Sequence, residues 1–311
     1  MKPLPFLAAL FLAAVSSNTS AADKPLLDGV KRVVFLGDSI TYAGQYVEFV
    51  EAWFRTRQPG QSIEFLDIGL PSETVSGLSE DGHAGGKFPR PDLHERLERV
   101  LAKSQPDLVV ACYGMNCGIY LPFAEERLAK YRDGLERLRK ACAAHGAKVL
   151  HVTPPTFDEV KGGKPGYAHT LDRYSEWLLG QRKAGWDVVD LHAPMNRYLA
   201  EQRAKDPKFF LAGDGVHCNE TGHWLIAKQV LLHLGAKDVA GASDAKAMLA
   251  AHPNGDAVLK LVQQRQRMLK DAWLTDTKHI RPGMKAGLPL AEAQAKAGEL
   301  EKLIADAAQA K

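Results

Sequence analysis

One serine in the sequence stands where a nucleophile would be expected. Ser39 follows the apolar run Arg32–Leu36, which is typical of a buried strand, and it precedes a segment with helical periodicity. Backbone N–H groups at the start of a helix can stabilise negative charge, which favours attack by this hydroxyl on a carbonyl group. Gly37 permits the tight turn before it, and Asp38 could cap the helix. The same short sequence is also compatible with a helix cap and nothing more.

An aspartate and a histidine could supply the base that such a serine needs. Asp214 precedes His217 by three residues, so its carboxylate can turn back toward the imidazole, fix its tautomer and support its positive charge. The sharp turn Gly213–Gly215 places the pair on a loop. An Asp–His pair is often structural or part of a metal site. The sequence has no HExxH motif, however, and apart from His223 its other histidines lie elsewhere, so we expect no metal.

Two further segments offer hydrogen-bond donors. Asn116 lies in Cys112–Gly118, directly after an apolar run, and its side-chain amide suits the oxyanion that forms when a serine attacks a carbonyl. The loop Gly69–Thr74 can turn backbone N–H groups toward the same point. An asparagine after a strand is also a common turn residue, so neither segment is specific by itself. Together, the four segments supply a nucleophile, a base, an orienting acid and oxyanion donors.

The order of apolar and helical segments predicts how these residues come together. Short β-rich runs alternate with amphipathic stretches, which favours a mostly parallel five-stranded sheet inside a three-layer α/β/α sandwich. Ligands of such sheets bind beyond the carboxyl ends of the strands, where all four segments are placed. The expected strands are Arg32–Leu36, Ile63–Ile68, Leu108–Tyr113, Lys148–Val152 and Val188–Leu191. The expected helices are Tyr42–Arg57, Pro91–Lys103, Glu125–His145, Thr170–Lys183, Pro194–Lys205 and Thr221–Leu234.

The first residues have the composition of a leader. A basic start, an apolar stretch and the small residues Ser20–Ala22 are typical of a secretory signal peptide. We therefore expect residues 1–22 to be removed, with cleavage near Ala22, and the protein to be secreted or periplasmic. Such compartments permit disulfides.

The last residues differ in composition from the predicted α/β domain, which spans residues 23–235. Residues 236–311 are rich in Ala, Lys, Gln and Glu, with helical periodicity at Val258–Leu274 and Leu290–Ala308. Two helices bury little apolar surface by themselves. We therefore expect a helical extension that packs on the core.

Composition and charge narrow the classes of function. The 311 residues carry 40 Lys and Arg against 37 Asp and Glu, and the net charge of +3 offers no electrostatic case for nucleic-acid binding. Beyond the leader, no apolar run reaches the length of a membrane span. Neither a metal nor an organic cofactor is implied.

With these motifs in this order, the sequence resembles the SGNH/GDSL hydrolase family. Gly37–Ile40 is similar to the first sequence block of the family, Gly114–Asn116 to the third, and Asp214–His217 to the Asp-x-x-His block. The resemblance covers residues 31–235 and implies a flavodoxin-like arrangement of the sheet. The sequence has no Gly-x-Ser-x-Gly elbow, which argues against an α/β-hydrolase.

The resemblance also implies a role for each motif residue. Ser39 would be the nucleophile, His217 the general base and Asp214 its orienting partner. Asn116 and the backbone N–H of Ser39 would belong to the oxyanion hole, together with the backbone N–H of Ser72.

The sequence departs from the family pattern at two positions. Ser72 stands where the family usually has a glycine, so its backbone N–H can serve only if this serine adopts a glycine-like conformation. Cys117 replaces the aspartate that usually follows the oxyanion asparagine. Asn116 itself is kept, so this second change concerns the contacts that support the loop.

The second departure suggests a disulfide. Cys117 follows the oxyanion asparagine, and Cys218 follows the histidine. If the family geometry holds, the two loops face each other, and in an exported protein these cysteines could be bonded. Two independent small residues are the alternative. Cys112 and Cys142 are expected to be free thiols on a strand and a helix.

These features lead us to expect an exported serine esterase, a carboxylic ester hydrolase that acts on O-acyl esters through an acyl-enzyme. The loops near the site are polar and glycine-rich, without a long apolar lid. This favours short, acetyl-type acyl groups on a small-molecule or carbohydrate alcohol. A non-catalytic carbohydrate-binding or scaffold protein remains an alternative, as does a lipase or acyltransferase with the same triad.

Overall fold

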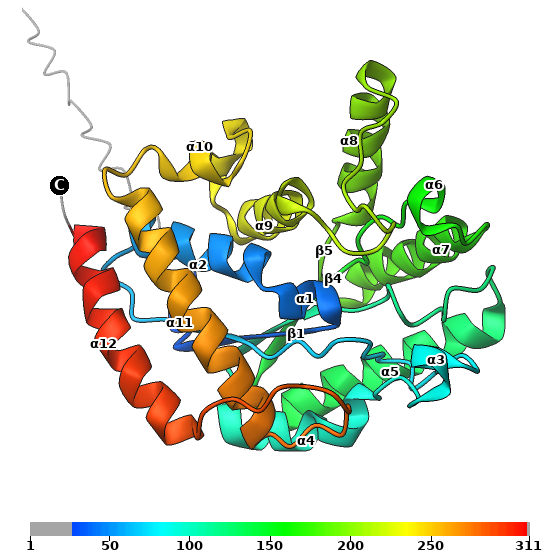
Figure 1. Ribbon diagram of the computed structural model, residues 1–311, viewed down its shortest axis with the longest axis horizontal. Helices are drawn as coiled ribbons and strands as arrows, with labels where there is room; N and C mark the ends of the chain where they lie inside the picture. The colour runs from blue at the N-terminus through cyan, green and yellow to red at the C-terminus, as the bar shows by residue number, and fades with distance from the viewer. Residues whose placement is uncertain (1–26, 310–311) are drawn as a thin grey trace, which may run out of the picture.

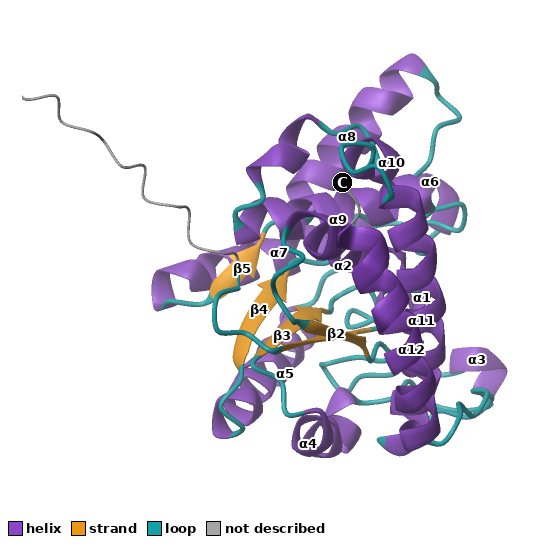
Figure 2. Cartoon of the chain, turned by 90° about the vertical axis from the view of Figure 1, so that its left-hand side faces the viewer, coloured by secondary structure: helices purple, strands orange, loops and turns teal. Residues whose placement is uncertain are grey.

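The centre of the protein is a parallel β-sheet that carries loops at its carboxyl edge. The structure is a computed structural model and describes residues 27–309. Its five strands are arranged in the order β2-β1-β3-β4-β5, and each neighbouring pair is parallel (Figures 1 and 2). The strands are β1 (Arg32–Gly37), β2 (Glu64–Asp67), β3 (Leu108–Cys112), β4 (Lys148–Val152) and β5 (Asp187–Val189). All five predicted strands are present, and their ends differ from the predicted ones by at most two residues.

The sheet is buried on both faces because alternate side chains of its strands enter two separate cores. Val33 and Phe35 of β1 point into one core, whereas Val34 and Leu36 point into the other. Helices α2 (Gln45–Arg57), α9 (Glu220–Leu234) and α10 (Ala245–Leu249) cover the first face (Figure 1). Helices α4 (Leu93–Ser104), α5 (Glu125–Ala144) and α7 (Tyr167–Gly180) cover the second. The predicted three-layer α/β/α sandwich is therefore confirmed.

The predicted helices are present in the structure. They are α2 (Gln45–Arg57), α4 (Leu93–Ser104), α5 (Glu125–Ala144), α7 (Tyr167–Gly180), α8 (His192–Lys205), α9 (Glu220–Leu234), α11 (Gly255–Asp276) and α12 (Leu290–Gln309). The short helices α3 (His83–Gly86), α6 (Glu159–Gly162) and α10 (Ala245–Leu249) were not predicted, because four or five residues show no periodicity.

One predicted helix is divided in two. The segment expected to be helical over Tyr42–Arg57 consists of α1 (Ser39–Ala43) and α2, which begins at Gln45. Gly44 separates them, since it adopts a left-handed conformation with φ of 85° and closes α1 through its N–H to the Thr41 carbonyl. The helix that begins at Ser39 is therefore a separate unit of five residues.

The two long C-terminal helices lie along the β2 side of the sheet (Figure 2). Gln266 of α11 donates a hydrogen bond of 2.8 Å to the backbone carbonyl of Phe65 in β2 and one of 2.6 Å to the Glu51 carboxylate in α2. Leu269 and Trp273 are buried in the second core. The extension thus shares a core with the sheet. The predicted signal peptide lies outside the described residues, and no helix among residues 27–309 is long and apolar enough to cross a membrane.

Candidate active site

Ser39 opens helix α1 directly after the central strand β1. The carboxylate of Asp38 caps the helix by accepting a 2.9 Å hydrogen bond from the Ile40 N–H. A Cβ atom at Gly37 would lie 2.0 Å from the Thr41 hydroxyl oxygen and 2.8 Å from the Cys112 carbonyl oxygen, so only glycine fits beside β3 at this turn. The cap predicted from the sequence is present, and it presents Ser39 at the positive end of the helix.

The structure brings three of the sequence-predicted residues into one hydrogen-bonded row. The Ser39 hydroxyl lies 2.9 Å from His217 Nε2, and His217 Nδ1 lies 2.6 Å from Asp214 Oδ2. Because the carboxylate requires a donor, Nδ1 carries the proton and Nε2 is left to accept from the serine hydroxyl. The side chains of His217 and Asp214 are about half exposed, at 56% and 55%.

Asp214 is held as a carboxylate by the groups around it. Burial raises the pKa of this carboxyl, but hydrogen bonds from the His217 ring and from the backbone N–H groups of His217 and Val216 more than offset this, so the net pKa is lowered. Asp38 shows the opposite balance. Its burial raises the pKa to about 6, although the Ile40 N–H and the charges of His217 and Arg90 lower it.

The loop that carries Asp214 and His217 is fastened to the segment around α6. The Gly215 carbonyl accepts a 3.0 Å hydrogen bond from the Asp158 N–H. A Cβ atom at Gly215, whose φ is 83°, would lie 2.5 Å from the backbone of Gly162. The Asp158 carboxylate in turn forms an ion pair with Arg203 of α8. Sequence reasoning missed Asp158 and Arg203, because they come together only through tertiary contacts.

The loops after β2 and β3 flank Ser39, because these two strands are the neighbours of β1 in the sheet. Ser72, in the first loop, has φ of 70°, so this serine adopts the left-handed conformation that usually belongs to glycine. The condition for the Gly-to-Ser replacement is therefore met. Asn116, in the second loop, is only 3% exposed and donates a 3.3 Å hydrogen bond to the Glu73 carbonyl.

A buried ion pair between Arg96 and Glu73 supports the loops after β2 and β3. Arg96 of α4 contacts both carboxylate oxygens of Glu73, at 2.6 and 2.8 Å, and donates a 2.9 Å hydrogen bond to the Ile68 carbonyl. The Tyr113 hydroxyl donates to the same carboxylate at 2.7 Å. Burial raises the pKa of Glu73 even though Arg96 lowers it. Glu73 and Arg96 were not predicted, since no local motif marks a salt bridge between residues so far apart.

The disulfide predicted between Cys117 and Cys218 is not formed, and all four cysteines are free thiols. Cys117 lies in the second core, where burial raises the pKa of its thiol to about 11 despite hydrogen bonds with the backbones of Val75 and Ser76. Cys218 packs against the first core, beside Gly222 of α9. The two side chains therefore lie on opposite faces of the sheet. Cys117 supports the loop that carries Asn116 through its own hydrogen bonds, including one from the Ser76 hydroxyl to its carbonyl at 3.2 Å.

Metal ligands do not gather anywhere in residues 27–309, where no group of three or more His, Cys, Asp or Glu side chains could hold an ion. One hollow, of about 650 Å³, lies between α11, α12 and the start of β2, and is lined among others by Arg32, Arg55 and Arg265.

Solved structures with the same fold include several esterases. The chain is similar to a gut microbial diltiazem-metabolizing enzyme, BT4096, with a TM-score of 0.55 and 24% identity over 66% of this chain and 47% of that one. It thus spans about half the length of this first relative. The acetylxylan esterase Axe2 from Geobacillus stearothermophilus has a TM-score of 0.52 and 22% identity, over 66% of this chain and 94% of Axe2. The acetyl xylan esterase AlAXEase has a TM-score of 0.52 and 21% identity, over 65% and 98% of the two chains.

No curated protein shows significant sequence similarity to the chain. Comparison with models of protein families gives a more specific result. A family model for GDSL-like lipases and acylhydrolases matches residues 35–225, more than half of the 311 residues, and this range includes every predicted site residue. The resemblance deduced from the motifs is therefore confirmed. The chain belongs to the GDSL-like lipase/acylhydrolase family of carboxylic ester hydrolases.

Proposed function

We propose that the protein is a serine esterase in which Ser39 is the nucleophile, His217 the general base and Asp214 the residue that orients the base. The observation that carries this proposal is the row of hydrogen bonds from Ser39 to His217 at 2.9 Å and from His217 to Asp214 at 2.6 Å. Three residues from two distant segments meet in the order and at the distances that nucleophilic catalysis requires.

The proposed reaction has two stages. In the first, His217 Nε2 takes the hydroxyl proton while Ser39 Oγ bonds to the ester carbonyl carbon. The resulting oxyanion accepts hydrogen bonds from the backbone N–H groups of Ser39 and Ser72 and from the Asn116 amide. The bond to the alcohol oxygen then breaks, and His217 gives its proton to the leaving alcohol. In the second stage, water loses a proton to His217 and attacks the acyl-enzyme, which releases the carboxylic acid and returns the proton to Ser39.

We propose short acyl groups on a sugar or another polar alcohol as the substrate. The loops around Ser39 are polar, and the exposed side of the site is the His217 side, where the alcohol would leave. Acetylxylan esterases share the fold, and their substrates are acetylated sugars of this kind. The expected partner is accordingly a small-molecule or carbohydrate ester.

We also propose that the protein is exported. The leader at residues 1–22 supports this by its sequence. Mass spectrometry of the protein recovered from the periplasm or the medium of an expressing bacterium should give a chain that begins at Asp23. Full-length protein retained in the cytoplasm would contradict export and leave the esterase assignment intact.

A comparison of the protein with its Ser39→Ala variant tests the catalytic proposal. We expect hydrolysis of p-nitrophenyl acetate and covalent labelling by a fluorophosphonate probe, with both lost in the variant by at least about 10³-fold in rate. Full activity in Ser39→Ala would refute the proposal, whereas absence of both activities in the folded protein would favour a scaffold.

The acyl group and the acceptor need separate assays. Among p-nitrophenyl esters, activity should fall from acetyl to decanoyl, and an increase along this series would favour a lipase. Acetate released from acetylated xylo-oligosaccharides would support the sugar proposal. Transfer of the acetyl group to an added alcohol in preference to water would identify an acyltransferase.

A further inference from the structure

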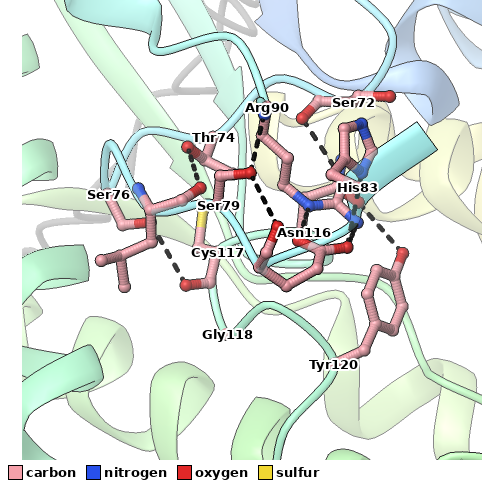
Figure 3. A network of polar contacts seen from close by, with 12 residues as sticks. Ser72, Thr74, Ser76, Ser79, His83, Arg90, Asn116, Cys117, Gly118 and Tyr120 are labelled. Atoms are coloured by element: carbon pink, nitrogen blue, oxygen red, sulfur yellow. Dashed lines mark hydrogen bonds and ion pairs between the residues drawn. The ribbon is translucent and has the colours of Figure 1, made fainter. Parts of the chain in front are cut away.

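A chain of contacts joins the two loops that are proposed to bind the oxyanion. Arg90 Nη1 donates to the Ser72 carbonyl at 3.5 Å, and the guanidinium carbon lies 5.2 Å from the centre of the Tyr120 ring. The Tyr120 hydroxyl donates a 3.0 Å hydrogen bond to Asn116 Oδ1. Figure 3 shows Arg90 between the Ser72 loop and Tyr120. Neither Arg90 nor Tyr120 belongs to a motif of the sequence.

We propose that Tyr120 is a positioning residue for ester hydrolysis, which orients the Asn116 amide toward the oxyanion, and that Arg90 holds Tyr120 against the Ser72 loop. This inference rests on the proposed function, because it assigns Tyr120 a role through the proposed oxyanion donor.

The hydrogen bonds of the Asn116 amide fix its orientation. A side-chain amide can turn over and exchange its oxygen and nitrogen, and only one of the two orientations offers N–H groups to an oxyanion. The Tyr120 hydroxyl fixes Oδ1 on one side, while Nδ2 uses one hydrogen for the Glu73 carbonyl. The second hydrogen of Nδ2 then remains for a ligand. A donor on Oδ1 also polarises the amide and strengthens the hydrogen bonds that Nδ2 can donate.

The Tyr120 hydroxyl remains able to donate its hydrogen bond to Asn116. Burial raises the pKa of Tyr120 far above its usual value, and the negative charge of Asp38 raises it further, although Arg90 lowers it. The phenol therefore keeps its proton at any pH at which the protein would work. It does not become a phenolate, which could only accept a hydrogen bond and would compete for Nδ2.

The backbone at Tyr120 is held in an unusual conformation. Ile119 and Tyr120 are consecutive residues with φ of 50° and 57°, in the left-handed region that side chains other than glycine rarely adopt. This conformation is unfavourable for residues that carry a Cβ atom. The ring contacts of Tyr120 offset this cost, since its centre lies 4.8 Å from that of Tyr167 and 5.9 Å from that of Phe157. This packing holds an unfavourable backbone in the one conformation that brings the hydroxyl to Asn116.

Arg90 braces the two loops, because each of its side-chain nitrogens has a partner among residues 27–309 and none is left for an anionic substrate. Its Nε and Nη2 each lie 2.6 Å from a carboxylate oxygen of Glu80, and Nη1 contacts the Ser72 carbonyl. Burial raises the pKa of Glu80, but Arg90 more than offsets this and the net pKa is lowered, so the acid stays charged. The side chain of Arg90 is only 6% exposed, which keeps the guanidinium fixed over the Tyr120 ring.

Tyr120→Phe is the direct test, because it removes the hydroxyl and keeps the ring. With p-nitrophenyl acetate we expect kcat to fall about tenfold and KM to change less than twofold, since loss of a whole oxyanion donor costs about 10²–10³. Tyr174→Phe is the matched control. The Tyr174 hydroxyl is buried and has no hydrogen-bond partner within residues 27–309, so its removal should leave kcat unchanged.

A double-mutant cycle separates orientation from a general loss of structure. If Tyr120 acts through Asn116, Tyr120→Phe should change kcat less than twofold when Asn116 is already alanine. Asn116→Ser replaces Asn116→Ala if the alanine variant does not give a cooperative thermal melt. A wild-type kcat in Tyr120→Phe, or an undiminished tenfold loss in the Asn116 variant, would overturn the inference.

The outcome also distinguishes this inference from the proposed function. An active protein whose activity disappears in Ser39→Ala but persists fully in Tyr120→Phe would refute only the role of Tyr120. A folded protein without esterase activity, or one that stays active as Ser39→Ala, would refute the proposed function first.

Discussion

Lys270, near the end of the C-terminal helix α11, donates a hydrogen bond to the backbone carbonyl of Tyr42 in the helix that begins with Ser39. Its ammonium nitrogen also lies 4.1 Å from the centre of the Tyr42 ring, and the neighbouring Asp271 accepts a 3.1 Å hydrogen bond from the Tyr42 hydroxyl. The C-terminal extension is thus attached to the short helix that carries the proposed nucleophile.

Replacing Lys270 by methionine should weaken this attachment while keeping the aliphatic stem. The change removes a charged hydrogen bond and a cation–π contact, so we expect the free energy of unfolding to fall by about 1–3 kcal/mol. We also expect kcat for p-nitrophenyl acetate to fall severalfold per folded molecule. Urea unfolding and steady-state kinetics measure both. Lys260→Met is the control, because Lys260 is exposed on the same helix. Equal stability and activity in the two variants would show that the contact contributes nothing.

Asp67 should make the stability of the protein depend on pH. Burial raises the pKa of Asp67 to about 7 from 3.8, although Lys270 and the Gly69 N–H lower it. The native state therefore binds the proton more tightly than the unfolded chain, so stability falls as the pH rises between these two values. Asp67→Asn removes this contribution and should be the more stable protein above pH 7, by on the order of a few kcal/mol.

Urea unfolding of the Asp67→Asn variant and the wild type at several pH values between 4.5 and 8 provides the measurement. Asp38 has a raised pKa as well, but it is present in both proteins and cancels in the difference. If the free energies of unfolding of the two proteins differ by the same amount at every pH in this range, the raised pKa of Asp67 is contradicted.

Removal of residues 236–311 should prevent folding of the remaining α/β domain. Leu269 and Trp273 are buried in the core beneath the sheet, and Gln266 is bonded to β2, so the shortened chain would expose apolar surface along an unprotected strand. Expression of residues 23–235 should give aggregated protein, whereas the chain from residue 23 to 311 stays soluble. A soluble fragment with a cooperative thermal melt would instead identify the extension as a separable unit.

The cysteines should all titrate as free thiols. Denatured protein prepared without reductant should release four equivalents of thionitrobenzoate from Ellman's reagent, one for each thiol. In the native protein the reaction should be slow, because burial raises the pKa of Cys117 to about 11 and that of Cys218 to about 12. Two equivalents, with a Cys117–Cys218 peptide pair in the digest, would restore the disulfide that the sequence suggested.

The sequence allowed the strands and long helices to be predicted because each is marked by its own residues. Runs such as Val33–Leu36 are apolar throughout, and the helices show one apolar stripe. The break at Gly44 was not predicted, because a single glycine is tolerated within a helical pattern. The helix that begins at Ser39 therefore appeared continuous with α2. The left-handed conformation of Gly44 is visible only in the structure.

The residues that support the site were beyond sequence reasoning for a different reason. Ser39, Asp214 and His217 belong to short motifs. Arg90 and Lys270 instead act through partners 18 and 228 residues away in the chain. Tyr120 is only four residues from Asn116, but it contacts Asn116 from a left-handed backbone that no local motif marks. The error on Cys117 and Cys218 has the same origin. Their positions relative to Asn116 and His217 were right, but the face of the sheet to which each side chain points depends on packing across the whole domain.

The Asn116 side and the His217 side of the site differ in their exposure to solvent, and this difference would set the orientation in which an ester binds. Asn116 is 3% exposed, whereas more than half of the His217 side chain is exposed. An ester would thus enter with its acyl end inward and its alcohol end in open water. Esters on any side group of a long polymer could then be hydrolysed while the polymer chain itself stays outside the enzyme. The alcohol would leave and the attacking water would enter through the same exposed side of the site. Hydrolysis of each acyl-enzyme would therefore begin only after the alcohol has left.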